Sequence, residues 1–392
     1  MSDELKRNTQ DLQPLDPKNQ TDASPNVSDA ATTAEVAVCS GPMPAIGLKK
    51  GIFQVATVKI GDVIEESSHA IPGKFKDILL TTDLSPNAEA AAPFAVALAK
   101  QSGGTIHLFH AIEDDPMEAL LSGVVIGASA WLKSVREQRR EQLAKMATTL
   151  GGNTGLTITQ TCVTGHPAIE AVKFAQKIHA DVIVLSTHGR TGIPHLFLGS
   201  VAEKIVRLSP IPVLTVRPGE AVPDEFKFKT ILVPTDFSEN SKAAIIYAVK
   251  LAKPHGAKLI LAHVVENATN YCDPASSACA MPDVNKWMEF LKAQGEKKLA
   301  EDAAWLASKS DIAAMTELKY GRADEEICNM AREYKVDLVV MSTHGHTGFS
   351  HFAFGSVAER VLRKCPVPIL SIRPIGVPIK SETAGASKVI KA

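Results

Sequence analysis

Short apolar runs and longer amphipathic segments alternate in a regular order between residues 75 and 216 of this chain. Buried strands produce the first kind of pattern and half-buried helices produce the second. Five apolar runs predict strands, at 78–80, 106–112, 156–163, 181–185 and 213–216. Four segments predict helices, at 88–100, 131–150, 168–179 and 201–208. Glycines at 103–104 and 151–152 predict the ends of the first two helices.

The same order of runs starts again near Phe228, so the chain contains an internal repeat. Residues 228–236 match 75–83 with a shift of 153 positions, and residues 342–363 match 186–207 with a shift of 156. In the second pair of segments 13 of 22 positions are identical, which chance does not produce within one chain. Each copy therefore predicts the same folding unit.

Strands that alternate with helices predict an α/β fold with a doubly wound parallel sheet, as in Rossmann-like domains. We therefore expect two tandem five-stranded parallel sheets, in domains at 74–217 and 227–374. Residues 1–73 predict a disordered or partly ordered N-terminal arm, because their first 44 residues are polar and have no period. Residues 375–392 predict a polar tail.

Composition and charge exclude several classes of function. The net charge is −1 and aromatic residues make up 5% of the chain, which argues against a nucleic-acid surface. The N-terminus lacks the apolar core of a signal peptide, and no run of about 18 apolar residues predicts a membrane span. The six cysteines show no metal-ligand spacing and predict a reduced chain. We therefore expect a cytoplasmic protein.

The repeated segments 186–200 and 342–356 follow the fourth strand of each copy and precede a helix. In doubly wound sheets ligands bind beyond the carboxyl ends of the strands, where these segments and the strand-ending Asp83 and Asp236 are expected. Ser200 with Glu203, and Ser356 with Glu359, fit capping boxes. A helix that begins there presents free N–H groups, which can donate hydrogen bonds to the oxygens of a phosphate. Alternatively, the same box marks only the start of a helix.

These segments resemble the glycine loop of the universal stress protein family, whose nucleotide-binding members carry Gly-x2-Gly-x9-Gly-(Ser/Thr). Gly189-x9-Gly199-Ser200 and Gly345-x9-Gly355-Ser356 fit the last three elements. Serine stands at the first glycine position in both copies. The resemblance covers about 74–217 and 227–374, and it implies strand order 3-2-1-4-5. It also implies pairing through the last strand, which a tandem chain satisfies internally, while a homodimer stays open.

The resemblance implies that the protein binds ATP or AMP, with Mg²⁺ held through the phosphates. The acidic residue after strand one then faces the ribose or adenine, and the backbone after strand two contacts the adenine. The Pro-Thr-Asp element of the family is complete at 234–236 and altered at 81–83. Candidate binding residues in the first copy are Thr82, Asp83, Ala111, Ser186, His188, Gly189, Arg190, Gly192, Gly199, Ser200 and Val201. Those in the second copy are Thr235, Asp236, Val264, Ser342, His344, Gly345, Gly348, Gly355, Ser356 and Val357.

Three functions follow from this pattern. The first is a stress-response regulatory protein that binds adenine nucleotide in one or both copies without turning it over. The second is a slow nucleotide hydrolase or phosphotransferase, in which Asp83 or Asp236 holds a metal ion. The third is an interaction module, in which Ser186 and Ser342 mark lost nucleotide affinity. The chain has no Gly-x4-Gly-Lys-(Ser/Thr) loop and no evident general base, which favours binding over catalysis.

Overall fold

The computed structural model describes residues 75–113, 128–187, 198–220, 228–266, 284–310, 312–344 and 355–373. All of them belong to one unit of the chain, 59–392. The arm predicted at 1–73 and the tail predicted at 375–392 lie outside the described residues. The two copies of the repeat are called domain 1 and domain 2 below.

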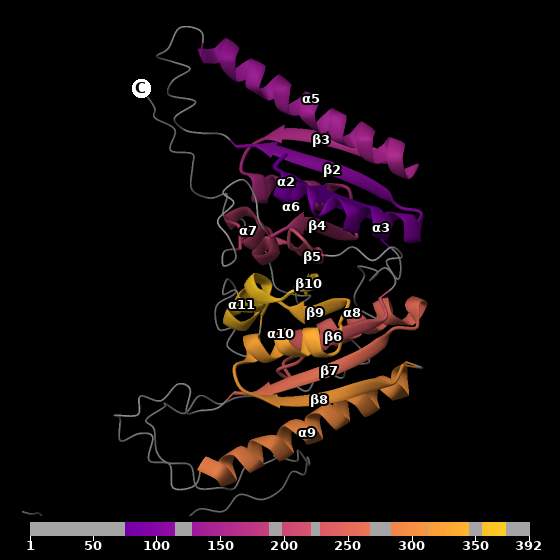
Figure 1. Cartoon of the computed structure of the whole chain (residues 1–392), viewed down its shortest axis with the longest axis vertical. Helices are drawn as coiled ribbons and strands as arrows, with labels where there is room; N and C mark the ends of the chain where they lie inside the picture. Colours follow the sequence, from indigo (N-terminus) through magenta and orange to yellow (C-terminus); the bar gives the residue numbers. More distant parts are fainter. Residues whose placement is uncertain are drawn as a thin grey trace, which may run out of the picture. The chain divides into compact units, whose positions relative to one another are not determined.

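Each domain contains the predicted alternation of strands and helices (Figure 1). The strands of domain 1 are β1 (Asp77–Thr81), β2 (Thr105–Ile112), β3 (Ile158–Thr164), β4 (Val182–Ser186) and β5 (Val213–Val216). Its helices are α2 (Pro86–Glu89), α3 (Ala92–Ser102), α5 (Ala128–Thr154), α6 (Pro167–Lys177) and α7 (Ser200–Leu208). The strands of domain 2 are β6 (Thr230–Pro234), β7 (Lys258–Val265), β8 (Ala314–Tyr320), β9 (Leu338–Ser342) and β10 (Ile369–Ile372). Its helices are α8 (Glu239–His255), α9 (Val284–Lys309), α10 (Ala323–Glu333) and α11 (Ser356–Lys364).

Two helices differ from the sequence prediction. The helix expected at 88–100 is divided into α2 and α3, with Pro93 in the first turn of α3. Proline lacks the N–H that would bond to the preceding turn, which disfavours a continuous helix at this point, and the matching position of α8 is Ile246. Helix α5 passes through 151–152 and ends at Thr154, beside Gly155 with its positive φ of 68°. The left-handed residue ends the helix, and the first glycines do not.

The strand order within each domain is the predicted 3-2-1-4-5, with parallel pairing throughout. It reads β3-β2-β1-β4-β5 in domain 1 and β8-β7-β6-β9-β10 in domain 2. The two sheets are continuous, because β5 and β10 pair in antiparallel fashion with Leu214 opposite Leu370. The result is one ten-stranded sheet in place of two separate ones.

Reciprocal hydrogen bonds join the two domains beside this central strand pair. The guanidinium of Arg217 donates to the carbonyl oxygen of Lys364 at 3.1 Å, just after β5. Arg373, at the matching position after β10, donates to the carbonyl oxygen of Leu208 at 3.0 Å. Each arginine satisfies a carbonyl at the end of the other domain's last helix, where acceptors are left without intrahelical donors. The expected pairing of the domains within the chain is therefore confirmed.

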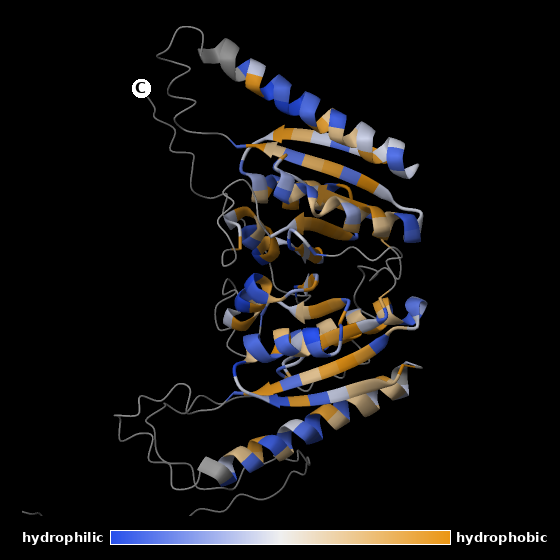
Figure 2. Cartoon of the chain, viewed as in Figure 1, coloured by the Kyte–Doolittle hydropathy of each residue, from blue (hydrophilic) through white to orange (hydrophobic). Residues whose placement is uncertain are grey.

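Two layers of buried side chains cover the faces of the sheet. One layer includes residues of α3, α5, α8 and α9, and the other includes residues of α6, α7, α10 and α11. Figure 2 shows hydrophobic residues concentrated on the strands and hydrophilic ones along α5 and α9. Within the described ranges, every helix is too short or too polar to cross a membrane.

Candidate functional site

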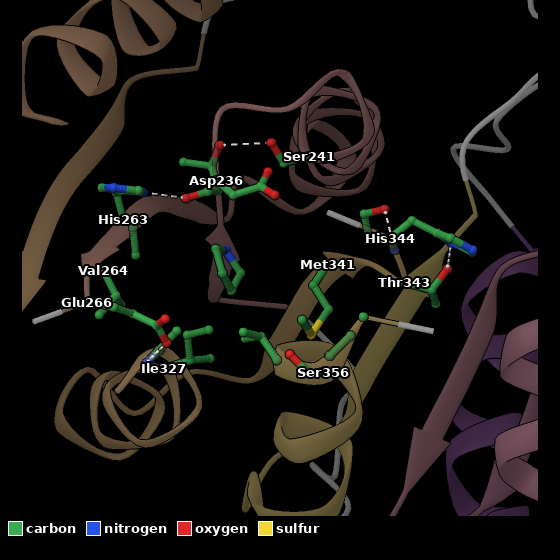
Figure 3. A pocket seen from close by; sticks show the side chains of 18 residues that line it. Asp236, Ser241, His263, Val264, Glu266, Ile327, Met341, Thr343, His344 and Ser356 are labelled. Atoms are coloured by element: carbon green, nitrogen blue, oxygen red, sulfur yellow. Dashed lines mark hydrogen bonds between the residues drawn. The ribbon is translucent and has the colours of Figure 1, made fainter. Parts of the chain in front are cut away.

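A cavity of about 310 Å³ lies in domain 2 at the carboxyl ends of β6, β7 and β9. The amino-terminal turns of α10 and α11 form the opposite part of its wall. Figure 3 shows Asp236 and Ser356 on opposite sides of this space, with Val264, Glu266 and Ile327 along a third side. Its volume is in the range of small-molecule sites. The cavity therefore lies at the ligand edge that the sequence predicts.

Eight of the candidate residues in the second copy line this cavity: Thr235, Asp236, Val264, Ser342, His344, Gly355, Ser356 and Val357. In domain 1 the matching positions are Thr82, Asp83, Ala111, Ser186, Gly199, Ser200 and Val201. Six candidates lie outside the described residues: His188, Gly189, Arg190, Gly192, Gly345 and Gly348.

Ten lining residues were not among the predicted site residues: Pro234, Ser241, Ala262, His263, Glu266, Ala323, Ile327, Met341, Thr343 and Ala358. Glu266 follows Val264 by two positions, so the period of a strand could have placed both side chains on one side. Ala323 and Ile327 are four residues apart on α10 and therefore share a face of that helix. Ser241, Ala262 and Met341 carry no distinguishing pattern in the sequence.

Asp236 forms part of a hydrogen-bonded turn after β6. Its Oδ1 accepts from the backbone N–H of Ser238 at 3.0 Å and from the hydroxyl of the same residue. Thr235 supports the turn from inside, because its hydroxyl oxygen accepts from the N–H of Phe237 at 3.0 Å. Phe237 has a positive φ of 65°, which costs energy for a residue with a side chain. The turn thus holds the carboxylate in the cavity wall.

Asp83 and Ser85 make the same two hydrogen bonds after β1, and Leu84 has a φ of 62°. The turn is therefore a repeated feature of the fold.

A backbone hydrogen bond joins the two ends of each glycine loop. The N–H of Gly355 donates to the carbonyl oxygen of Thr343 at 2.9 Å, and Gly199 donates to Thr187 at 2.8 Å. Both glycines have negative φ, −64° and −58°, so positive φ does not require glycine here. A Cβ at Gly199 would instead lie 3.3 Å from the Thr187 oxygen. The close approach of two backbone segments explains the glycine.

The predicted capping boxes are wrong in detail. The N-caps of α7 and α11 are Gly199 and Gly355, and neither cap residue contributes a side-chain hydrogen bond. Ser200 and Ser356 are the first helical residues, because the preceding glycines already have the extended ψ of an N-cap. The first three N–H groups of α11 have no intrahelical acceptor, as in any α-helix. They belong to the part of the helix that lines the cavity.

His344 is buried at the end of β9, with 8% of its surface exposed. Its ring Nδ1 pairs with the hydroxyl of Thr343 at 2.9 Å, and its backbone N–H donates to the hydroxyl oxygen of Ser342. Burial lowers the pKa of His344, and the charge of Arg373 lowers it further. The imidazole is therefore neutral at neutral pH.

Glu266 lies at the other end of the cavity, where its Oε1 accepts from the N–H of Ala323 at 3.2 Å. This bond places a carboxylate against the amino terminus of α10, which favours negative charge. Across the described ranges, no three His, Cys, Asp or Glu side chains gather closely enough to hold a metal ion.

Asp324 anchors α10 to α11 beside the cavity. Its side chain is fully buried, with Lys364 Nζ at 2.6 Å, Arg360 Nε at 3.2 Å and Arg322 Nη2 at 3.4 Å. Burial acts to raise the pKa of Asp324, but the Lys364 hydrogen bond and the three positive charges outweigh it and hold the pKa below its usual value. The carboxylate is thus charged and paired at neutral pH.

Asp324→Ala is expected to lower the free energy of unfolding by about 2 kcal/mol at pH 7, because it leaves the three cations without their shared acceptor. The depressed pKa makes this stabilisation complete above the unfolded value of about 4, and it is lost as the pH falls through the folded pKa. Urea denaturation at pH 7 and pH 3 measures both effects. Glu325→Ala, which removes an exposed partner of Arg322, is the control and should change stability by less than about 0.5 kcal/mol. An equal loss in both variants would contradict the anchoring role.

The fold and the cavity together define a class of protein. It has two Rossmann-like α/β domains in tandem, joined through their last strands, with a ligand-sized cavity at the strand ends of domain 2. The model of the universal stress protein family matches residues 74–217 and again residues 227–373. The chain belongs to the universal stress protein family.

Similar proteins cover either one domain or both. Universal stress protein MJ0531 of Methanocaldococcus jannaschii is 32% identical over 149 residues, 37% of this chain and 82% of that protein. Universal stress protein Slr1230 of Synechocystis is 26% identical over 327 residues, 76% of this chain and 100% of that protein. A solved universal stress protein from Archaeoglobus fulgidus has a TM-score of 0.54 and 22% identity, and the alignment covers 77% of this chain and 98% of that one. The last likeness shows the fold.

Proposed function

We propose that this protein is a stress-response regulatory protein that binds an adenine nucleotide, ATP or AMP, in the cavity of domain 2. The observation that carries the proposal is the amino terminus of α11, with Gly355 and Ser356, facing a cavity that also contains a carboxylate and an apolar wall. Helix N–H groups and a serine hydroxyl suit phosphate oxygens. Membership of the family adds support, because its nucleotide-binding members carry the same glycine-serine element.

Each part of the nucleotide has a matching part of the wall. The phosphates lie against the first turn of α11, and the ribose hydroxyls lie within reach of Asp236. The adenine ring packs against Val264, Ile327 and Met341, which supply apolar surface between β7, β9 and α10. Mg²⁺ is held through the phosphates, since the described residues offer no three-ligand site of their own.

A slow nucleotide hydrolase is the second candidate, and His344 is the observation that favours it. His344 is one of the residues that line the cavity, and its imidazole is unprotonated at neutral pH because burial lowers its pKa. A neutral imidazole can accept a proton from an attacking water. Asp236, the other candidate group, already accepts two hydrogen bonds from Ser238 at one oxygen. Binding without turnover needs neither group to act as a base.

The test begins with the full chain as purified. Bound small molecules are released from one portion by denaturation and identified by mass spectrometry. A second portion, kept folded and freed of bound nucleotide, is titrated with ATP, AMP and GTP by calorimetry. We expect ATP or AMP to bind with a dissociation constant below about 1 mM and GTP to bind more weakly. If no adenine nucleotide binds at millimolar concentration, the proposal is overturned. The third hypothesis, an interaction module without nucleotide affinity, would then be favoured. Phosphate release that disappears in His344→Gln would establish the hydrolase.

A further inference from the structure

The two domains keep the same residues at the phosphate end of the site and differ at the opposite end. The end that includes the amino terminus of the last helix is identical in both copies: Ser186 and Ser342, Thr187 and Thr343, Gly199 and Gly355, Ser200 and Ser356, Val201 and Val357. The strand and helix residues around the proposed adenine position have changed. Duplication alone would have left both ends alike.

The largest difference is on the second strand of each domain. Ala262 of β7 and Ile327 of α10 both line the cavity of domain 2. The matching residue of β2 is Phe109, whose side chain is 2% exposed. Its ring stacks on Phe174 of α6, with the ring centroids 5.3 Å apart. The Phe109 ring thus fills a layer between strand and helix in which domain 2 has the methyl group of Ala262 and the buried Met330, the counterpart of Phe174.

The facing helix shows the opposite change in size. Where α10 has Ile327, α6 has Ala171, and both residues are buried. In domain 2 the bulk comes from the helix, and the strand side presents only the methyl group of Ala262 to the cavity. In domain 1 the bulk comes from the strand itself, and the small Ala171 leaves room for the Phe109 ring. Close packing of this kind leaves no room for a second ring.

The rim of the site differs as well. In domain 2 the N–H of Ala323 donates to the carboxylate of Glu266 and holds it at the cavity. The matching residues of domain 1 are Pro167 and Glu113. Proline has no N–H to donate, and Glu113 is exposed. Domain 1 therefore cannot hold a rim carboxylate in the same way.

We infer that the chain takes up one adenine nucleotide, in domain 2, and that domain 1 is a pairing domain whose adenine position is occupied by the Phe109 ring. This inference rests on the proposed function, because it assigns the proposed ligand to one of two similar sites. Domain 1 contributes β5 and Arg217 to the junction with domain 2.

Calorimetry of the full chain with ATP tests the inference first by stoichiometry. We expect one ATP per chain in the wild type. In the series Ala262→Val, Ala262→Leu and Ala262→Phe, the affinity should fall with side-chain size and be at least tenfold lower for phenylalanine. Circular dichroism and the melting temperature show whether each variant is folded, and the small valine change keeps the series informative. Phe109→Leu is the matched control in domain 1 and should bind ATP as the wild type does.

A gain of binding tests the inference from the other direction. Phe109→Ala combined with Pro167→Ala opens the strand side of domain 1 and restores the missing N–H, so we expect two ATP per chain. A value that stays at one would contradict the role given to Phe109. Two ATP per wild-type chain, or unchanged affinity in Ala262→Phe, would overturn the single-site inference alone. A wild type that binds no adenine nucleotide would overturn the proposed function itself.

Discussion

Gly355→Val is expected to weaken ATP binding at least about thirtyfold, or about 2 kcal/mol, while the chain remains folded. Gly355 has a φ of −64°, which valine also adopts, so the change introduces no backbone strain. Its N–H donates to Thr343 at the base of the loop. At the matching Gly199 a Cβ would lie 3.3 Å from the facing carbonyl oxygen, which is tighter than ordinary contact. The branched side chain therefore moves the start of α11 and covers its N–H groups.

A second glycine provides the control for this change. Gly152 lies within α5, and a Cβ placed there meets no described atom within 4 Å. Gly152→Val should therefore leave the ATP affinity within about twofold of the wild type. Calorimetry measures both affinities, and thermal melting shows that both variants fold. If Gly355→Val bound ATP as tightly as Gly152→Val, the phosphates could not lie at the amino terminus of α11.

Leu370→Ala is expected to lower the free energy of unfolding by about 3 kcal/mol. Leu370 is 1% exposed and lies opposite Leu214 in the antiparallel pair that joins the two domains. It also belongs to the buried layer that spans both domains and includes Leu338 and Val340. Truncation leaves a cavity in the strand pair that joins the two domains. Urea denaturation at several protein concentrations measures the loss and shows whether self-association contributes to it.

The control for Leu370 is Met315, an apolar residue on the outermost strand β8 with 43% of its surface exposed. Met315→Ala should change the free energy of unfolding by less than about 0.5 kcal/mol, because its side chain is already largely hydrated. Comparable losses for Met315→Ala and Leu370→Ala would mean that the domain junction adds nothing beyond ordinary burial. The assignment of β5 and β10 as the structural link between the domains would then be wrong.

The order of elements was predictable because periodicity and turn chemistry are local properties of the chain. The strand at Val213–Val216 was predicted with its observed bounds, and most other elements differ by a few residues at their ends. The two helices that were predicted wrongly differ for local reasons that hydrophobic periodicity does not show. Pro93 divides a helix that its neighbours favour, and α5 continues through Gly151 because packing outweighs the propensity of two glycines.

The sequence predicted the part of the candidate site formed by strand ends and the glycine loop, but not the part formed by α10. Residues at strand ends and in the glycine loop, such as Asp236 and Ser356, were named because topology places all such positions at one edge of the sheet. Ala323 and Ile327 were missed because the residues that a helix presents to a cavity depend on its distance from the sheet and its rotation about its own axis. Neither can be read from the sequence. The capping box failed because a glycine before the serine can itself become the N-cap.

By itself the sequence determined that the chain has two copies of one α/β unit, where their strands and helices lie, and which edge of the sheet can take a ligand. These properties depend on period, repeat and turn residues, all of which are readable along the chain. The resemblance implied pairing through the last strands, but only the tertiary structure showed that this pairing is antiparallel and makes one continuous sheet, with Leu214 opposite Leu370. It alone showed that Ala262 faces a cavity while Phe109 lies in a packed layer. That outcome depends on the sizes of side chains that face each other across strand and helix, about 65 positions apart in the chain.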